Sequence, residues 1–299
     1  MPATVPELAR RDSGCGAYGH AMRIRIIDAF TDRPFAGNPA AVCLLDGGAW
    51  PDTAWMQRVA AEMNLSETAF ARPLPAGSET DWALRWFTPM VEEKLCGHAT
   101  LATAHALRSD RGPGTVSFSS ASGVLITHAH EDGTITLDFP AAPLAETSIP
   151  DGLAAALGAE PDAVYTTGPL GDLVVVFAAE SAVRTLDPDV TAVARLSRRD
   201  ALRGVTVTAP GSDPAGGYDF VSRFFAPADG IPEDPVTGSA HTALAPYWSD
   251  RLGRDELTGL QASARTGLVR TAVRGDRVHL TGEAVTVLDG SLLAPALSR

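Results

Sequence analysis

The chain has 299 residues, of which 45% are hydrophobic, and a formal net charge of −12 at neutral pH. A chain of this length can bury one large core or two modest ones. The negative charge argues against nucleic acid or acidic membranes as partners, because both attract a basic protein face. The three cysteines, Cys15, Cys43 and Cys96, lie in no C-x-x-C spacing and favour a reducing cytosol over a disulfide scaffold.

The first 21 residues lack the apolar core of a signal peptide, and we predict a disordered extension over residues 1–21. The sequence has no run of 18 apolar residues that could form a membrane span. We therefore expect a cytoplasmic protein with no membrane partner.

From residue 22 onward the apolar pattern predicts a mixed chain with more strand than helix. In the first half we expect strands over 23–28, 39–45 and 82–87 and helices over 53–62 and 97–108. A meander follows over 116–118, 123–129 and 134–139, with Asp132-Gly133 as a hairpin turn. The second half carries expected helices over 153–157, 190–195 and 239–252 and strands over 173–177, 204–208, 220–224, 268–273, 277–281 and 284–288. Pro246 lies inside the helix over 239–252, and the last strand is a candidate to return to the first half.

Two stretches of the chain repeat each other at a distance of 138 residues. Arg85-Trp-Phe-Thr-Pro recurs as Arg223-Phe-Phe-Ala-Pro, and each is followed by a helix start led by glycine, at Gly97 and Gly238. Such a repeat indicates two similar half-domains that face each other. Two helix N-termini with free backbone N–H groups would then converge on one cleft and could hold an anion.

Three side chains near these repeats are candidate proton carriers. Glu67 follows a predicted helix, His98 lies in the first turn after Gly97, and Asp234 precedes Gly238. Glu, His and Asp are the usual acid and base groups near neutral pH. Each also has a structural interpretation, as a solvated carboxylate, a helix-capping imidazole or a turn-forming aspartate.

Four separated segments, 27–42, 64–70, 85–107 and 233–248, resemble the PhzF-like family of phenazine biosynthesis, which shares the diaminopimelate epimerase-like fold. The resemblance implies an α+β fold of two pseudo-symmetric barrel-like half-domains, each a mostly antiparallel sheet around a central helix. We place the first half-domain at 22–115 plus 284–299 and the second at 116–283. The resemblance also implies a homodimeric acid/base isomerase without cofactor or metal, with Glu67, His98 and Asp234 as its catalytic residues.

The substrate expected from this pattern is a small anionic metabolite. The residues expected to bind it are those around the two helix starts and before Glu67, namely Ser66, Gly97, Ala99, Thr237, Gly238 and Ser239. In racemases of this fold a cysteine stands at each helix start, whereas this chain has Cys96 at the first and Thr237 at the second. A threonine hydroxyl is no base near neutral pH, which disfavours racemisation by two thiols. Two alternative functions remain. One is a racemase or epimerase that uses Cys96 with a non-thiol partner, and the other is a non-catalytic binding protein.

Overall fold

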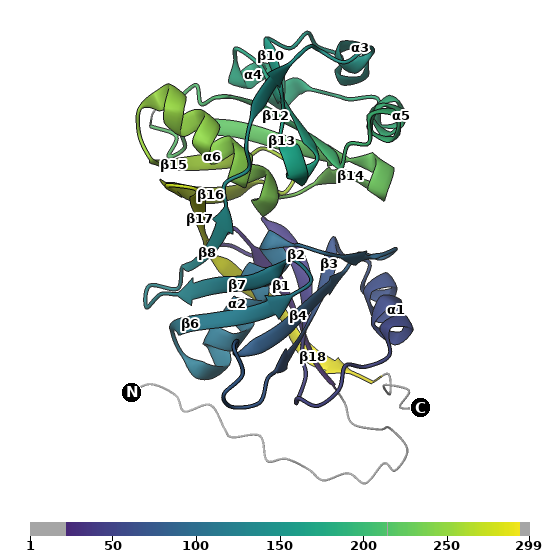
Figure 1. Ribbon diagram of the computed structural model, residues 1–299, viewed down its shortest axis with the longest axis vertical. Helices are drawn as coiled ribbons and strands as arrows, with labels where there is room; N and C mark the ends of the chain where they lie inside the picture. The colour runs from purple at the N-terminus through teal and green to yellow at the C-terminus, as the bar shows by residue number, and fades with distance from the viewer. Residues whose placement is uncertain (1–21, 214, 294–299) are drawn as a thin grey trace, which may run out of the picture.

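The computed structural model describes residues 22–213 and 215–293, so the disorder predicted for residues 1–21 lies outside the described residues. The chain forms two lobes stacked along its longest axis, each with a sheet wrapped around one long helix (Figure 1). Among the described residues no helix is both long and apolar enough to cross a membrane.

The first lobe surrounds helix α2 with strands from both ends of the chain. Its elements are β1 (Met22–Ala29), β2 (Asn38–Leu44), α1 (Thr53–Met63), β3 (Glu67–Pro73), β4 (Trp82–Phe87), β5 (Glu92–Glu93), α2 (Gly97–Arg111), β6 (Gly114–Ser120), β7 (Gly123–Ala129), β8 (Ile135–Pro140) and β18 (Ala284–Leu292). The strands pair in the order β18, β1, β2, β3, β4, β6, β7, β8, with β5 beside β4. The β2/β3 and β4/β6 pairs are parallel and the others antiparallel.

The second lobe repeats this arrangement around helix α6. Its elements are β9 (Ala145–Thr147), α3 (Leu153–Leu157), β10 (Ala163–Thr166), β11 (Asp172–Val176), α4 (Glu180–Thr185), α5 (Val190–Asp200), β12 (Gly204–Pro210), β13 (Phe220–Ala226), β14 (Ile231–Asp234), α6 (Gly238–Leu252), β15 (Glu256–Gln261), β16 (Gly267–Arg274) and β17 (Arg277–Gly282). The strand order β9, β10, β11, β12, β13, β15, β16, β17 matches the first lobe, and β11/β12 and β13/β15 are its parallel pairs. The two lobes join where β8 pairs with β17. The predicted duplicated α+β fold is therefore confirmed.

The boundary expected between residues 115 and 116 differs from the observed packing. Phe118, Leu125 and Ile135, which lie on β6, β7 and β8, share one hydrophobic core with Leu101 of α2. The meander therefore belongs to the first lobe, because its apolar face packs against α2, the central helix of that lobe. The first lobe extends to Pro140 before the chain crosses to the second.

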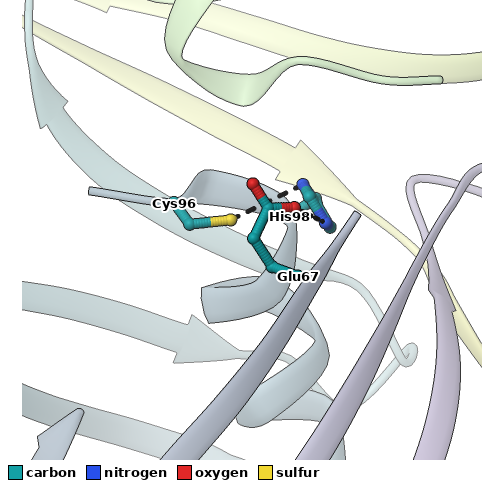
Figure 2. A group of neighbouring side chains, drawn as sticks. All are labelled: Glu67, Cys96 and His98. Atoms are coloured by element: carbon teal, nitrogen blue, oxygen red, sulfur yellow. Dashed lines mark hydrogen bonds and ion pairs between the residues drawn. The ribbon is translucent and has the colours of Figure 1, made fainter. Parts of the chain in front are cut away.

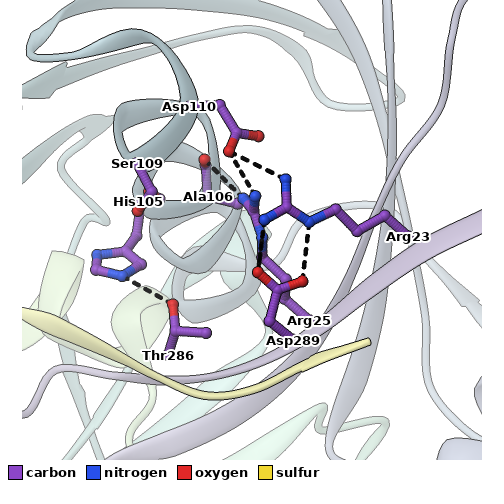
Figure 3. A network of polar contacts seen from close by, with 8 residues as sticks. All are labelled: Arg23, Arg25, His105, Ala106, Ser109, Asp110, Thr286 and Asp289. Carbon is purple, nitrogen blue, oxygen red and sulfur yellow. Dashed lines mark hydrogen bonds and ion pairs between the residues drawn. The ribbon is translucent and has the colours of Figure 1, made fainter. Parts of the chain in front are cut away.

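The last strand returns to the first lobe, as the sequence suggested, and polar contacts fix it there (Figure 3). Arg23 Nε of β1 donates to Asp289 Oδ1 of β18 at 2.8 Å. The neighbouring Arg25 is buried and donates to the Ala106 carbonyl of α2 at 2.8 Å and to Asp110 Oδ1 at 2.5 Å. A buried guanidinium is tolerated because these acceptors replace its lost water.

Local sequence explains how α1 leads into β3. Asp52 accepts a hydrogen bond from the Trp55 backbone N–H at 3.0 Å and caps the helix start. Asn64 ends the helix in the left-handed conformation, with a φ of 50°, which asparagine tolerates better than most residues. The chain then turns directly into β3, so Glu67 is the first residue of that strand.

Candidate active site

The N-termini of α2 and α6 meet at the junction of the two lobes. A Cβ atom added to Gly97 would lie 3.2 Å from the Gly238 Cα, and one added to Gly238 would lie 3.3 Å from the Gly97 Cα. Neither helix has a side-chain cap at its start. Glycine therefore allows the two backbones to approach closely, and uncapped N–H groups of both helices are available at the junction.

Glu67 and His98 form the central pair of the site (Figure 2). The Glu67 Oε2 atom lies 3.0 Å from His98 Nε2, and both side chains are buried. Among the described residues neither of these two atoms has a hydrogen bond of good geometry despite the short distance. Such loose contacts are common in catalytic sites without substrate, where alignment improves in the complex.

Asn38 connects this pair to the second lobe. Its Nδ2 atom donates to Asp234 Oδ1 at 2.8 Å and to the Val236 carbonyl at 2.9 Å, and it lies 3.1 Å from His98 Nδ1. Thr237 donates its hydroxyl to Asp234 Oδ2 at 2.5 Å. His98 of the first lobe and Asp234 of the second therefore share one amide nitrogen, and both are buried.

Burial and neighbouring charges set the protonation of these groups. Burial lowers the pKa of His98, but the adjacent Cys96 and Glu67 outweigh it, and the pKa ends well above its ordinary 6.5. Burial, and the Glu67 carboxylate next, raise the pKa of the Cys96 thiol to about 11. A thiol with that pKa stays neutral at pH 7.

A small cavity connects all three predicted catalytic residues. The residues that line it include Glu67, His98 and Asp234 together with Gly97, Thr237, Gly238 and Ser239. Two residues predicted to bind substrate do not line it. Ala99 is fully buried in the first-lobe core, and Ser66 is half-buried beside Glu67.

Several residues at the site were not predicted from the sequence. Arg203, Glu93 and Asp229 line the cavity, and Asn38 bridges the lobes. Burial raises the pKa of Glu93, and the Glu67 and Asp229 charges add to that rise. Asn38 lies in the segment 27–42 that carried the family resemblance, which was the one available signal. Arg203 lies outside all four resembling segments.

Glu67, Cys96 and His98 could also hold a metal ion, since one ligand atom from each lies within 4.8 Å of the other two. A thiol, an imidazole and a carboxylate form a donor set that suits Zn²⁺. His128 and His130, which stand two residues apart in the sequence, lie outside this cluster and contact threonines, His128 Nδ1 with Thr115 Oγ1 at 2.8 Å and His130 Nε2 with Thr136 Oγ1 at 2.9 Å.

Comparison with known proteins agrees with the fold. The chain matches the family described as phenazine biosynthesis-like protein over residues 27–290. An uncharacterized isomerase of Pseudomonas aeruginosa is 46% identical over 268 residues, which cover 89% of this chain and 96% of that protein. The crystal structure of a phenazine biosynthesis PhzF family protein from Enterococcus faecalis has a TM-score of 0.81 at 39% identity, covering 91% of this chain and 99% of that one.

A hydroxyproline epimerase from Agrobacterium vitis, with a TM-score of 0.57 at 13% identity over 92% of this chain and 94% of that one, shares the fold alone. Fold and relatives together define an enzyme of the isomerase class on an epimerase-like scaffold. The chain belongs to the phenazine biosynthesis-like protein family. The predicted family and enzyme class are confirmed.

Proposed function

We propose that this protein is an acid/base isomerase that needs no cofactor and moves a proton between carbons of a small unsaturated carboxylate. The observation that carries the proposal is the buried Glu67 carboxylate, which lines the cavity 3.0 Å from His98. A general base has to be shielded from water and free to reach a carbon-bound proton. Glu67 meets both conditions, because its Oε2 makes no well-aligned hydrogen bond among the described residues.

In this proposal each polar group of the site has one task. Glu67 removes a proton from a carbon next to the unsaturated system and returns it to another carbon on the same face. The protonated His98 lies beside Glu67 and stabilises negative charge that develops on the substrate. Asp234 and Thr237 lie across the cavity and accept or donate a hydrogen bond to a hydroxyl or amino group of the substrate.

Racemisation through opposed thiols receives no support from the site. The Cys96 thiol has a pKa of about 11, and the corresponding position of the second helix is Thr237, whose hydroxyl already donates to Asp234. At neutral pH neither group is a base for a carbon-bound proton.

The test is proton exchange in heavy water. Small unsaturated carboxylic acids, such as cyclohexene and cyclohexadiene carboxylates, are incubated with the protein in D₂O, and deuterium incorporation and double-bond position are followed by NMR. We expect Glu67→Gln to lower the exchange rate by at least 100-fold and to leave the binding of the acid intact. Glu62→Gln, on the exposed face of α1, is the matched control and should exchange at the wild-type rate. A loss of less than tenfold in Glu67→Gln would reject Glu67 as the base.

A further inference from the structure

The duplication gives the second lobe a counterpart of the Glu67 position. The first residue of β3, Glu67, lies opposite Ala40 of β2 in a parallel pair. In the second lobe the corresponding parallel pair places Gly204, the first residue of β12, opposite Asp172 of β11. Each position lies beside the N-terminus of the central helix of its lobe, so Gly204 occupies the place that Glu67 occupies in the first lobe.

Gly204 cannot carry a functional side chain. A Cβ atom added there would lie 2.2 Å from Cζ of the Phe224 ring, which fills the space. The polar group at this place comes from the preceding residue, because Arg203 Nη2 donates to Ser239 Oγ at 3.1 Å. Ser239 is the second residue of α6, just as His98 is the second residue of α2. Arg203 therefore contacts Ser239 in one lobe as Glu67 contacts His98 in the other.

Arg203 is held in place from three sides. Its Nη2 also donates to Asp172 Oδ2, a carboxylate on a side chain that is 1% exposed. Its Nε donates to the Leu170 carbonyl at 3.3 Å, and its guanidinium lies over the Phe224 ring, 5.1 Å from the ring centre. None of the hydrogen bonds found among the described residues uses Nη1, and Arg203 lines the same cavity as Glu67 and His98.

The charges around the cavity mean that an anionic ligand needs Arg203 to offset the repulsion by nearby carboxylates. Four carboxylates line the cavity, on Glu67, Glu93, Asp229 and Asp234, and each would repel a carboxylate ligand. Among the described residues that line it, Arg203 is the one cationic side chain besides His98. The Nη1 group of Arg203, free among the described residues, can donate a charge-assisted hydrogen bond to a carboxylate oxygen, which favours an anion over a neutral ligand.

We propose that Arg203 and Ser239 form a carboxylate-binding subsite of the second lobe, which holds the acid group of the ligand while Glu67 and His98 face its reacting carbons. Ser239 Oγ accepts from Arg203, so its own hydroxyl hydrogen is free for a carboxylate oxygen. Asp172 is a positioning residue that acts through Arg203. The duplicated fold thus divides its two equivalent positions between proton transfer in the first lobe and anion binding in the second. This assignment deepens the proposed isomerase function and rests on it for the orientation of the ligand.

The subsite is tested by binding, independently of turnover. Benzoate and cyclohex-1-ene-carboxylate are compared with their uncharged amides by titration calorimetry on wild type, Arg203→Met, Arg203→Lys and Arg274→Met. Arg274 is exposed, pairs with the exposed Glu256 and does not line the cavity, so its variant matches the change in net charge. Circular dichroism checks that each variant is folded.

We expect the wild type to bind the acids at least tenfold more tightly than the amides and Arg203→Met to lose that preference, as a charge-assisted hydrogen bond of ordinary strength requires. Arg203→Lys keeps the charge beside Asp172 and should lose about three- to tenfold, because an ammonium group cannot contact Asp172, Ser239 and the ligand through the separate nitrogens of a planar group. If Arg203→Met does not fold, Arg203→Lys shows whether Arg203 contributes to the binding of the acid. Arg274→Met should bind like the wild type.

Equal acid affinity in wild type and the folded Arg203 variants would overturn the subsite, and so would a wild type that does not prefer acids to amides. The proposed isomerase function fails separately, when Glu67→Gln exchanges deuterium like the wild type. If Arg203→Met loses acid binding while Glu67→Gln still exchanges deuterium at the wild-type rate, the subsite is supported and Glu67 is rejected as the base.

Discussion

Cys96 and His98 stand two residues apart at the start of α2, and the same surroundings leave each of them protonated at neutral pH. Burial raises the pKa of the thiol to about 11, while burial lowers the pKa of the imidazole and the neighbouring Cys96 and Glu67 raise it well above its ordinary 6.5. The resting site therefore pairs a neutral thiol with an imidazolium and a carboxylate. In the proposed mechanism, proton transfer in this state centres on Glu67 and His98, and the thiol packs in the cavity wall.

Replacing Cys96 by alanine should accordingly retain most of the activity. The change removes a sulfur atom 3.6 Å from His98 Nδ1 but no titrating group near neutral pH. We expect a deuterium exchange rate within about fivefold of wild type, since a weak contact to one ring nitrogen is lost. Complete inactivation of Cys96→Ala, with its circular dichroism unchanged, would instead favour a racemase that uses this thiol.

The buried Asp234 makes stability depend on pH in a defined direction. Burial raises its pKa from an ordinary 3.8 to about 6, with Glu67 acting in the same direction and His98 against it. The folded state therefore binds a proton more tightly than the unfolded state. The stability that this proton confers is complete below about pH 4 and is lost as pH rises through 6.

Asp234→Asn removes this titration while keeping an oxygen acceptor for Asn38. We expect the free energy of unfolding of the variant, relative to wild type, to rise by up to about 3 kcal/mol between pH 4 and pH 7, because a shift of roughly two pKa units corresponds to that energy. Urea unfolding at pH 4, 5, 6 and 7 measures the difference. A relative stability that is flat with pH, or that falls as pH rises, would contradict the raised pKa.

Metal chemistry gives another test of the Glu67, Cys96 and His98 cluster. We expect EDTA to leave the exchange rate unchanged, because the proposed proton transfer uses side chains alone. Added Zn²⁺ should inhibit the exchange reaction, since ligand atoms within 4.8 Å of one another can bind the ion, which then engages the proposed base Glu67. Cys96→Ala should weaken that inhibition by at least tenfold, as loss of a thiolate ligand requires. Activity that disappears with EDTA and returns with added metal would contradict the proposal that proton transfer needs no metal ion.

The two central helices bring their N-termini together because glycine stands at both contact points. Gly97→Ala places a Cβ 3.2 Å from the Gly238 Cα, tighter than an ordinary contact, so one helix has to shift by a few tenths of an ångström. We expect activity to fall at least tenfold while the melting temperature changes by less than about 5 °C, since catalytic geometry is more sensitive than packing to small displacements. Gly290→Ala in β18, whose nearest contact would be 3.6 Å away, is the control. Wild-type activity in Gly97→Ala would show that the close approach is not required.

The elements that sequence predicted best are those with long local patterns. The helix expected over 97–108 runs from Gly97 to Arg111, and the one expected over 239–252 begins one residue earlier, at Gly238. The short strands β9, β10 and β14 were missed, because three or four residues carry too little periodicity to be recognised. The domain boundary was placed wrongly for a related reason, since the pairing of β4 with β6 that keeps the meander in the first lobe is non-local.

At the scale of the whole molecule, prediction of the site from sequence is likewise limited to residues that stand in local motifs. Glu67, His98 and Asp234 were predicted for the site because His98 and Asp234 stand near the repeat and Glu67 stands in a motif upstream of it. Arg203 stands 36 residues before Ser239 and reaches it only because the fold brings the start of β12 to the start of α6. No local pattern marks such a contact, whereas the symmetry of the two lobes makes it visible once β3 and β12 are compared.

The candidate active site lies where the two lobes meet, so we expect its residues to act as one unit. His98 belongs to the first lobe and Asp234 to the second, and both contact the Nδ2 atom of Asn38, at 3.1 and 2.8 Å. We expect His98→Ala and Asp234→Ala each to lower kcat by about 10² to 10⁴, the range for positioned acid and base groups. The double variant should lose far less than the product of the two, because both side chains lie against the same Asn38 amide and would act on the same bound substrate. Rates of all four proteins are compared by deuterium exchange on one substrate, and effects that simply multiply would show that the two residues act independently across the lobes.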